Sequence, residues 1–217
     1  MTLTRAAALL LLAGCSTPAP ERKAEAANPW LNVLWHGGEI QLGHYEIDDH
    51  TPAQTAAAVP VVMDAVFHED AMVAGRAILL LVQMRATQAV PVLIEALRDK
   101  DRKDRNSIVW ALGSLRSRPQ DCVPVLMDAL GDEDPFVRTC AGFALRDFGR
   151  DARAAVPRLI DAMNDSVWNV RQAVISALGD MGPDAAAAVP KLQEAMKDPE
   201  SGVSGAAAEA LGKIRPQ

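Results

Sequence analysis

The chain has 217 residues, of which 49% are hydrophobic and only 4% aromatic. Because the hydrophobic residues are mainly Ala, Val and Leu, close packing between helices is favoured over a β-sandwich. The formal net charge of −6 comes without a basic cluster, which excludes nucleic acid as an expected partner. No apolar stretch reaches the length of roughly 18 residues that a membrane-spanning helix needs, so none is expected.

The N-terminal residues 1–14 have the pattern of an export signal, with one positive charge at Arg5 followed by a short apolar core. The tetrapeptide LAGC, which ends at Cys15, resembles a bacterial lipobox. That resemblance implies lipidation of Cys15, whereas an ordinary signal peptide is the alternative. An Asp directly after the lipidated Cys would resemble an inner-membrane retention signal. This chain has Ser16 at that position, which favours the outer membrane. Residues 15–29 are rich in Pro, Ala and charge and are expected to form a flexible tether.

The rest of the chain repeats itself around five prolines that recur at a nearly constant interval. A Val precedes each proline, an acid stands at position +4 counted from it, and Asp stands at +8 in four of the five. A fixed period of about 33 residues predicts a stacked array of repeats. The prolines are Pro60, Pro91, Pro124, Pro157 and Pro190, and the repeats are placed at 52–82, 83–115, 116–148, 149–181 and 182–215, within a domain of residues 51–217.

Each repeat contains two helical patterns with apolar residues on one side. The first has them at −1, +2, +3 and +6, and the second at +13, +17, +20 and +21. Glycines at +22, namely Gly113, Gly179 and Gly212, are expected to end the second helix. Asp151 and Asp184 are expected to cap the first helix, which would place the proline inside that helix and bend it.

Three segments resemble the HEAT family in its short-repeat form, which is named after the phycobilisome lyases: AVPVLIEALRDKD, CVPVLMDALGDEDPFVR and AVPRLIDAMNDSVWNVRQAVISALGDMG. The resemblance covers about residues 52–215. It implies an all-α fold, a right-handed α-solenoid of about five two-helix repeats whose second helices line a concave face. In such repeats the acids at +8 and the arginines at +14 form a structural ladder rather than a catalytic site. The ladder residues are Asp99, Arg105, Asp132, Arg138, Asp165 and Arg171.

A partner-binding surface is expected where the second helices face away from the core. With the apolar stripe turned inward, positions +11, +15, +19 and +22 point outward and +12 lies on the flank. Exposed aromatic side chains beside amides are typical of protein-binding surfaces, although neighbouring helices could instead cover the rings. The candidates are Asn106, Trp110, Phe136, Thr139, Phe143, Trp168, Asn169 and Gln172.

Residues 30–50 fit no repeat and are expected to form an irregular N-terminal cap on the first one. They hold three of the four histidines, so a metal site built from His44, Asp48, Asp49 and His50 is the alternative. No ligand spacing, phosphate loop or nucleophile elbow is present, so we expect no catalytic site, no metal and no cofactor. A disulfide between Cys122 and Cys140 stays open.

The sequence therefore predicts a lipid-anchored scaffold of the bacterial cell envelope that binds another protein through its concave face. Three alternatives remain: a metal-binding or enzymatic protein that uses the His-rich segment, a lyase-like HEAT protein, and a structural spacer without a specific ligand.

Overall fold

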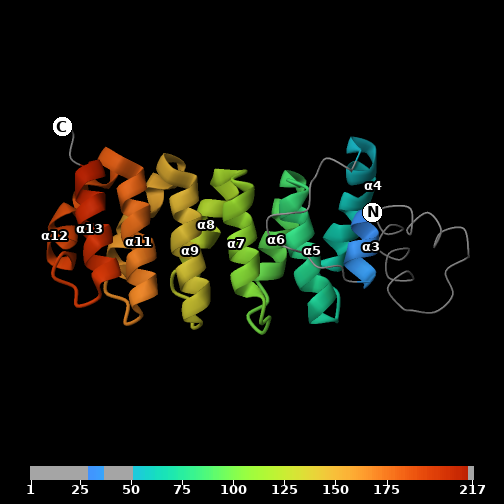
Figure 1. The fold of residues 1–217 in the computed structure, drawn as a ribbon, viewed down its shortest axis with the longest axis horizontal. Coiled ribbons are helices and arrows are strands. Elements are labelled where there is room, and N and C mark those ends of the chain that lie inside the picture. The colour runs from blue at the N-terminus through green and yellow to red at the C-terminus, as the bar shows by residue number, and fades with distance from the viewer. Residues whose placement is uncertain (1–28, 37–50, 215–217) are drawn as a thin grey trace, which may run out of the picture. The chain divides into compact units, whose positions relative to one another are not determined.

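The computed structural model describes residues 29–36 and 51–214, and within these ranges the chain is helical and contains no strand (Figure 1). The prediction of an all-α solenoid of two-helix repeats is confirmed. The predicted export signal, Cys15, the tether up to residue 28 and the histidines of the alternative metal site all lie outside the described residues. The chain divides into two compact units, residues 1–96 and 97–217.

The first unit begins with a helix taken from the non-repeated segment. Its helices are α3 (Pro29–His36), α4 (Pro52–Ala65), α5 (Ala71–Gln83), the 3₁₀ helix η2 (Thr87–Ala89) and α6 (Val90–Leu97), which ends just past the unit's boundary. Trp30 and Leu34 of α3 are 1% and 0% exposed. The Trp30 Nε1–H donates to Thr55 Oγ1 of α4 (3.2 Å), and Arg76 of α5 donates to the Leu34 carbonyl (3.4 Å). Helix α3 therefore packs against α4 and α5 and covers the apolar side of the first repeat.

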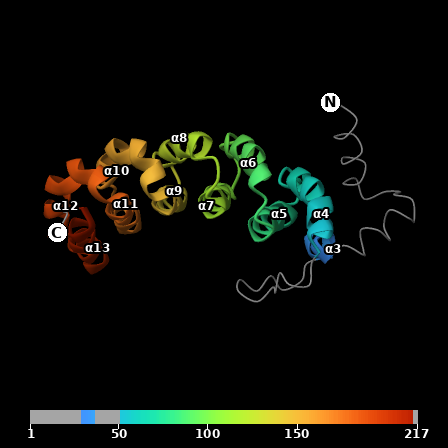
Figure 2. The same ribbon diagram turned by 90° about the horizontal axis from the view of Figure 1, so that it is seen from above.

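The second unit is a two-layer stack of helix pairs (Figure 2). The second helices lie side by side in one layer, and the first helices form the other layer. The first layer holds α7 (Arg105–Leu115), α9 (Pro135–Phe148), α11 (Trp168–Met181) and α13 (Ser201–Ile214). The other layer holds α8 (Pro119–Ala129), η3 (Gly149–Ala155) with α10 (Val156–Ala162), and η4 (Gly182–Ala188) with α12 (Val189–Ala195).

The apolar stripes of both layers meet in one continuous core. Leu126 and Leu159 at +2 of the first helices are fully buried, as are Leu112, Leu145 and Leu178 at +21 of the second helices. A buried leucine contributes about 1.5–3 kcal/mol relative to an exposed one. No single helix pair could enclose these side chains, so each repeat depends on its neighbours for stability.

The glycines at +22 do not end the second helices, contrary to the sequence prediction. Gly113 and Gly179 lie inside α7 and α11, where an added Cβ would approach the Cα atoms of Ala144 and Ala210 to 2.7 and 2.9 Å. Their missing side chains let neighbouring second helices touch. The helices end at position +25 instead, with Gly149 (φ +54°) after α9 and Gly182 (φ +61°) after α11.

Position +25 also has a positive φ without glycine in the first two repeats, although Arg116 (ψ 41°) is left-handed helical and Gly149 (ψ −127°) is not. Position +25 is Arg85 (φ +51°) in the first repeat and Arg116 (φ +43°) in the second. A side chain at such a φ costs about 1–2 kcal/mol relative to glycine. The offset of the turn is therefore fixed by the repeat, even where the residue type does not favour it.

The prolines also sit differently from the prediction in part of the array. Pro60 and Pro124 lie inside α4 and α8, whereas Pro157 and Pro190 stand in the first turn of α10 and α12, after a 3₁₀ segment. A proline fits the first turn because the N–H that it lacks has no partner there. Asp151 and Asp184 make no capping bond in η3 and η4. Asp184 instead accepts from Arg150 (2.9 Å).

Candidate functional site

The predicted ladder residues pair across repeat boundaries in the second unit. The arginine at +14 of one repeat donates to the aspartate at +8 of the next. Arg105 contacts Asp132 (2.8 and 3.3 Å), and Arg138 contacts Asp165 (2.6 and 3.1 Å). Arg171 contacts Asp198 in the same two-pronged way (2.8 and 2.9 Å). Three junctions are thus joined by equivalent ion pairs.

Each ladder arginine also closes the turn within its own repeat. Arg138 Nη1 donates to the Asp132 carbonyl (2.8 Å), and Arg171 Nη1 donates to the Asp165 carbonyl (2.9 Å). Arg105 likewise donates to the carbonyls of Lys100 and Arg102. A planar guanidinium with five donors is suited to serve a carboxylate and carbonyls at once.

The aspartates at +8 shape the turn rather than cap the helix that follows it. Asp132, Asp165 and Asp198 each accept the backbone N–H two residues ahead, at 2.8–3.0 Å. The cap of α9 is Asp134, which accepts from the Phe136 N–H (2.9 Å). Asp99 makes the same turn bond with the Asp101 N–H (3.0 Å), but position +14 of the first repeat holds Ala74 instead of arginine.

The ladder carboxylates are held in their charged form. Burial alone would raise the pKa of Asp132, but hydrogen bonds from Arg105 and from the Asp134 N–H outweigh it and lower the pKa below 3.8. The pKa of Asp165 is lowered in the same way, against its burial, by Arg138 and the Val167 N–H. A carboxylate engaged on all sides is poorly placed to exchange protons with a substrate, which favours a structural role.

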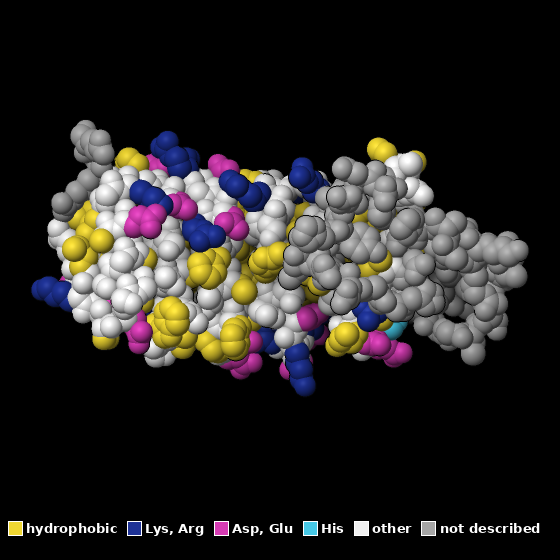
Figure 3. Space-filling view, viewed as in Figure 1, with side chains coloured by type: hydrophobic (Ala, Val, Ile, Leu, Met, Phe, Trp, Pro, Cys, Tyr) yellow, Lys and Arg dark blue, Asp and Glu magenta, His cyan; other side chains and the backbone are white. Residues whose placement is uncertain are grey.

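The eight candidate partner-binding residues lie on what we call the second-helix face, the surface of α7, α9, α11 and α13 that points away from α8, α10 and α12. Hydrophobic side chains gather on this face (Figure 3). Phe136 is 70% exposed, Trp168 43% and Trp110 40%, and Phe143 is partly exposed. Neighbouring helices therefore leave these four rings open to solvent, wholly or in part.

The polar candidates on this face are partly exposed, and two of them are already hydrogen bonded. The Thr139 hydroxyl donates to the Pro135 carbonyl (2.7 Å), and the Gln172 amide donates to the Gly202 carbonyl (3.3 Å). Asn106 and Asn169 are also partly exposed. Together with the rings, these groups give the face the mixed aromatic and amide character expected from the sequence.

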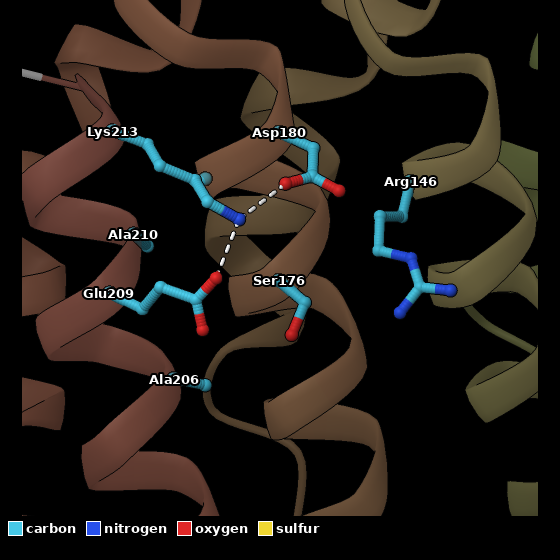
Figure 4. Close-up of a pocket in the computed structure, with 8 residues that line it drawn as sticks. Arg146, Ser176, Asp180, Ala206, Glu209, Ala210 and Lys213 are labelled. Carbon is cyan, nitrogen blue, oxygen red and sulfur yellow. Dashed lines mark hydrogen bonds and ion pairs between the residues drawn. The ribbon is translucent and has the colours of Figure 1, made fainter.

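The second-helix face also contains a depression that sequence reasoning missed (Figure 4). Its volume is about 140 Å³, and it lies between α9, α11 and α13. On one side the Lys213 ammonium contacts Asp180 (2.8 Å) and Glu209 (2.6 Å). Hydrogen bonding to Asp180, and then to Glu209, raises the pKa of Lys213. The remaining lining residues are Arg146, Ser176, Gly179, Ala206 and Ala210.

Arg146 forms the opposite wall of the depression. Its guanidinium lies 4.9 Å from the centre of the Phe143 ring, and Nη2 contacts Asp147 Oδ1 at 3.4 Å. Arg146 stands at +22, and Asp180 and Lys213 stand at +23. The repeat register already turned +22 outward, so aligning that column would have revealed that the third repeat carries arginine where three other repeats carry glycine and the first carries Val82.

Both described cysteines are free thiols, and neither is reactive by its surroundings. Cys122 is buried, its Sγ–H donates to the Ser117 carbonyl (3.2 Å), and burial raises its pKa to about 11. Burial also raises the pKa of Cys140. In the part of the chain that the structure describes, no group of three or more His, Cys, Asp or Glu side chains could hold a metal ion. Nor does any helix of that part have the length and hydropathy needed to span a membrane.

Comparison with known proteins agrees with this architecture. The family model for HEAT repeats matches residues 47–113, 93–166 and 156–217. No curated protein sequence matches the chain. Among solved structures, the complex of CpcE and CpcF of phycocyanin lyase from Nostoc sp. PCC7120 is similar, with 27% identity and a TM-score of 0.65 over 73% of this chain. The match spans only 65% of that lyase chain.

Two engineered structures share the fold at lower identity. An engineered protein is 20% identical with a TM-score of 0.61 over 99% of this chain and 97% of its own. A designed armadillo repeat protein in complex with the peptide (KR)4 is 16% identical with a TM-score of 0.59, over 96% of this chain and 98% of its own.

Proposed function

Because the chain belongs to the HEAT-repeat family, we propose that it is a binding scaffold that holds a protein partner on the second-helix face. The main support is the exposure of Trp110, Phe136 and Trp168 on adjacent rigid helices. Large rings that remain in solvent are enriched where proteins bind, because their burial there contributes much of the affinity. Rigid helices hold the rings in place, so little conformational entropy is lost on binding.

The charged groups of the ladder, together with Lys213 at the depression, support association rather than turnover. The ladder arginines and aspartates are engaged with one another, and Lys213 contacts two carboxylates. A general acid or base must be free to exchange a proton with a substrate within hydrogen-bond reach. The same groups instead hold neighbouring repeats together, which keeps the binding face in shape.

The proposal is tested by affinity capture with the full-length chain and two matched variants. Trp110→Ala combined with Phe143→Ala removes two rings from the second-helix face. Met196→Ala removes a large apolar side chain that is 49% exposed but follows α12 in the other layer. We expect the double variant to lose a protein that the wild type and Met196→Ala both retain. Identical captured proteins for all three chains would contradict the proposal and favour the structural spacer.

We further propose that the scaffold is anchored to a bacterial membrane, with the outer membrane favoured, through lipid on Cys15. The support is the sequence alone, since the apolar core of residues 6–13 and the LAGC tetrapeptide resemble a lipoprotein signal. Acyl chains anchor a protein by burying about 0.8 kcal/mol per methylene. Expression in a bacterium with radiolabelled palmitate should label the wild type but not Cys15→Ala. Label on both chains, or on neither, would refute the anchor.

A lyase-like role is the second candidate, supported by the 27% identity to a phycocyanin lyase chain. That structure is a complex of CpcE and CpcF, so a lyase-like role would require this chain to bind a second subunit together with a bilin. Titration of a bilin into the purified chain, followed by its visible absorption, tests this role. A red-shifted, saturable spectrum would favour the lyase-like role, and an unchanged spectrum would favour the scaffold.

A further inference from the structure

We propose that the second-helix face recognises an acidic segment of its partner protein, in which an Asp or Glu side chain lies beside a large apolar one. Arg146 receives the carboxylate, and the rings of Trp110 and Phe143 receive the apolar side chain. The inference rests on the proposed function, because it names the chemistry of the partner that the scaffold binds.

Arg146 reaches this face because the third repeat packs against its neighbour in a different way. Between α7 and α9, and between α11 and α13, the close approach is at +22, where Gly113 and Gly179 admit Ala144 and Ala210. Between α9 and α11 it lies one turn earlier, at Gly142, where an added Cβ would come within 2.8 Å of Ala173. The shift frees position +22 of α9 for a long side chain.

The environment of Arg146 differs from that of the ladder arginines. Arg105, Arg138 and Arg171 each make two contacts to one carboxylate, and their side chains are only 7–16% exposed. The Arg146 side chain is 38% exposed, and among the residues that the structure describes it contacts one carboxylate oxygen, that of Asp147, at 3.4 Å. Most of its five donors therefore remain available for the two-pronged bond that a carboxylate accepts.

Three carboxylates lie around the depression, and of these Asp147 contacts Arg146. Asp180 and Glu209 face the same depression, but both contact the Lys213 ammonium at its far side (Figure 4). At the ends of α7 and α9, Arg116 and Arg150 are exposed. Figure 3 shows basic side chains along the upper edge of the face, with acidic ones beside several of them. Lys213 is already held by two carboxylates, so Arg146, with one contact at 3.4 Å, is the basic group of the depression left for an added carboxylate.

The rings beside Arg146 complete the recognition surface. Trp110 and Phe143 both stand at +19, on the adjacent helices α7 and α9, and the Arg146 guanidinium lies over the Phe143 ring at 4.9 Å. Contact with the ring restrains the guanidinium and leaves its donor edge open. Tryptophan and arginine are also the residues that most often dominate binding energy at protein interfaces.

The test uses three fluorescein-labelled peptides of equal length, in which one Trp is flanked by Glu, by Gln or by Lys. Fluorescence anisotropy with the full-length chain gives the Kd of each peptide. We expect the Glu peptide to bind about tenfold more tightly than the Gln peptide, and the Lys peptide to bind most weakly. Arg146→Gln should abolish the preference for Glu, whereas Arg146→Lys should retain part of it. Arg158→Gln, at an exposed position of α10 in the other layer, is the matched arginine control and should keep the preference.

A Lys peptide that binds as tightly as the Glu peptide would overturn the inference, as would a preference that survives Arg146→Gln. No detectable binding of the Glu peptide up to about 1 mM would also overturn it. Failure of the inference is distinguishable from failure of the proposed function. If capture of a partner depends on Trp110 and Phe143 but not on Arg146, the proposed scaffold function is supported and only the proposed preference for acidic segments is refuted.

Discussion

Removing one carboxylate from the ladder should destabilise the second unit far more than removing an exposed one. In Asp132→Ala, the guanidinium of Arg105 loses two hydrogen bonds, at 2.8 and 3.3 Å, and keeps a 3.4 Å contact with the exposed Glu133, while its side chain stays only 7% exposed. Each charge-assisted bond contributes about 1.5–3 kcal/mol, and breaking a buried pair from one side costs about 3–5 kcal/mol. That cost is a large part of the roughly 5–15 kcal/mol that typically separates folded from unfolded protein.

Urea unfolding followed by far-UV circular dichroism measures the effect. With a slope of about 2–3 kcal/mol per molar, the loss corresponds to a midpoint lowered by about 1–2.5 M. Asp180→Ala is the matched control, because it breaks an ion pair whose side chains are 46% and 38% exposed. The control should cost about 1 kcal/mol or less.

A double variant distinguishes the loss of the Arg105–Asp132 hydrogen bonds from the cost of a buried Arg105 guanidinium without Asp132. Arg105→Met with Asp132→Leu removes both partners, and the apolar pair should restore most of the stability that Asp132→Ala loses. The reasoning is refuted if Asp132→Ala costs no more than Asp180→Ala, or if the double replacement is as unstable as the single one. In either case the ladder would contribute little to the stack.

Other properties of the described residues lead to three further expectations. The ladder carboxylates have lowered pKa values in the folded state, so the stability that they contribute is complete above about pH 4 and is lost as the pH falls through those lowered values. When the urea midpoint is measured against pH, Asp165→Asn should therefore lose less stability at acidic pH than the wild type does. An unchanged fall in the midpoint would contradict the assignment to these carboxylates. Gly149→Ala should lower the free energy of unfolding by about 1–3 kcal/mol because the φ of Gly149 is +54°, whereas Arg116→Gly should raise it by about 1 kcal/mol because the φ of Arg116 is +43°. Thermal unfolding measures both changes, and two changes of the same sign would refute the argument from backbone conformation. Cys122, with a pKa of about 11, should react with a thiol reagent at about pH 8 only after denaturation, and rapid reaction of the native protein would contradict its burial.

The fold was predictable because the same pattern of apolar residues around a proline recurs five times. A single amphipathic helix could pack in many ways, but Val-Pro and Ala-Leu pairs that recur with one fixed period define two buried stripes per repeat. The pairing of Arg138 with Asp165 follows from the same register, since both residue types recur at fixed offsets. Repetition made these features visible without any alignment.

The errors arose where one residue type serves two purposes. Glycine is favoured both at helix ends and where two backbones touch, and nothing local distinguishes Gly113 inside α7 from Gly149 after α9. After α7, position +25 is Arg116, so the expectation of glycine at a helix end could not identify this position. Likewise, Pro157 satisfies either a bent helix or a first turn, and only the preceding 3₁₀ segment decides between them.

The candidate site was only partly predictable for a related reason. The outward positions were derived from periodicity, and all eight named side chains are at least partly exposed. The depression beside Arg146 depends on where α9 and α11 touch, which is decided by the one-turn shift to Gly142. Such a shift changes the distance between helices without changing their pattern of apolar residues, so periodicity cannot report it.

The offset that links Arg138 to Asp165 also bears on how an array of this kind can lengthen. A tandem duplication of the segment 132–164, which is one full period, would copy one carboxylate and one guanidinium together. At the first seam Arg138 would meet the copied Asp132, and at the second seam the copied Arg138 would meet Asp165. Each seam thus pairs one original residue with one copied residue and leaves no ladder charge without a partner, so copying errors in a gene encoding such a chain can yield foldable descendants without a compensating mutation.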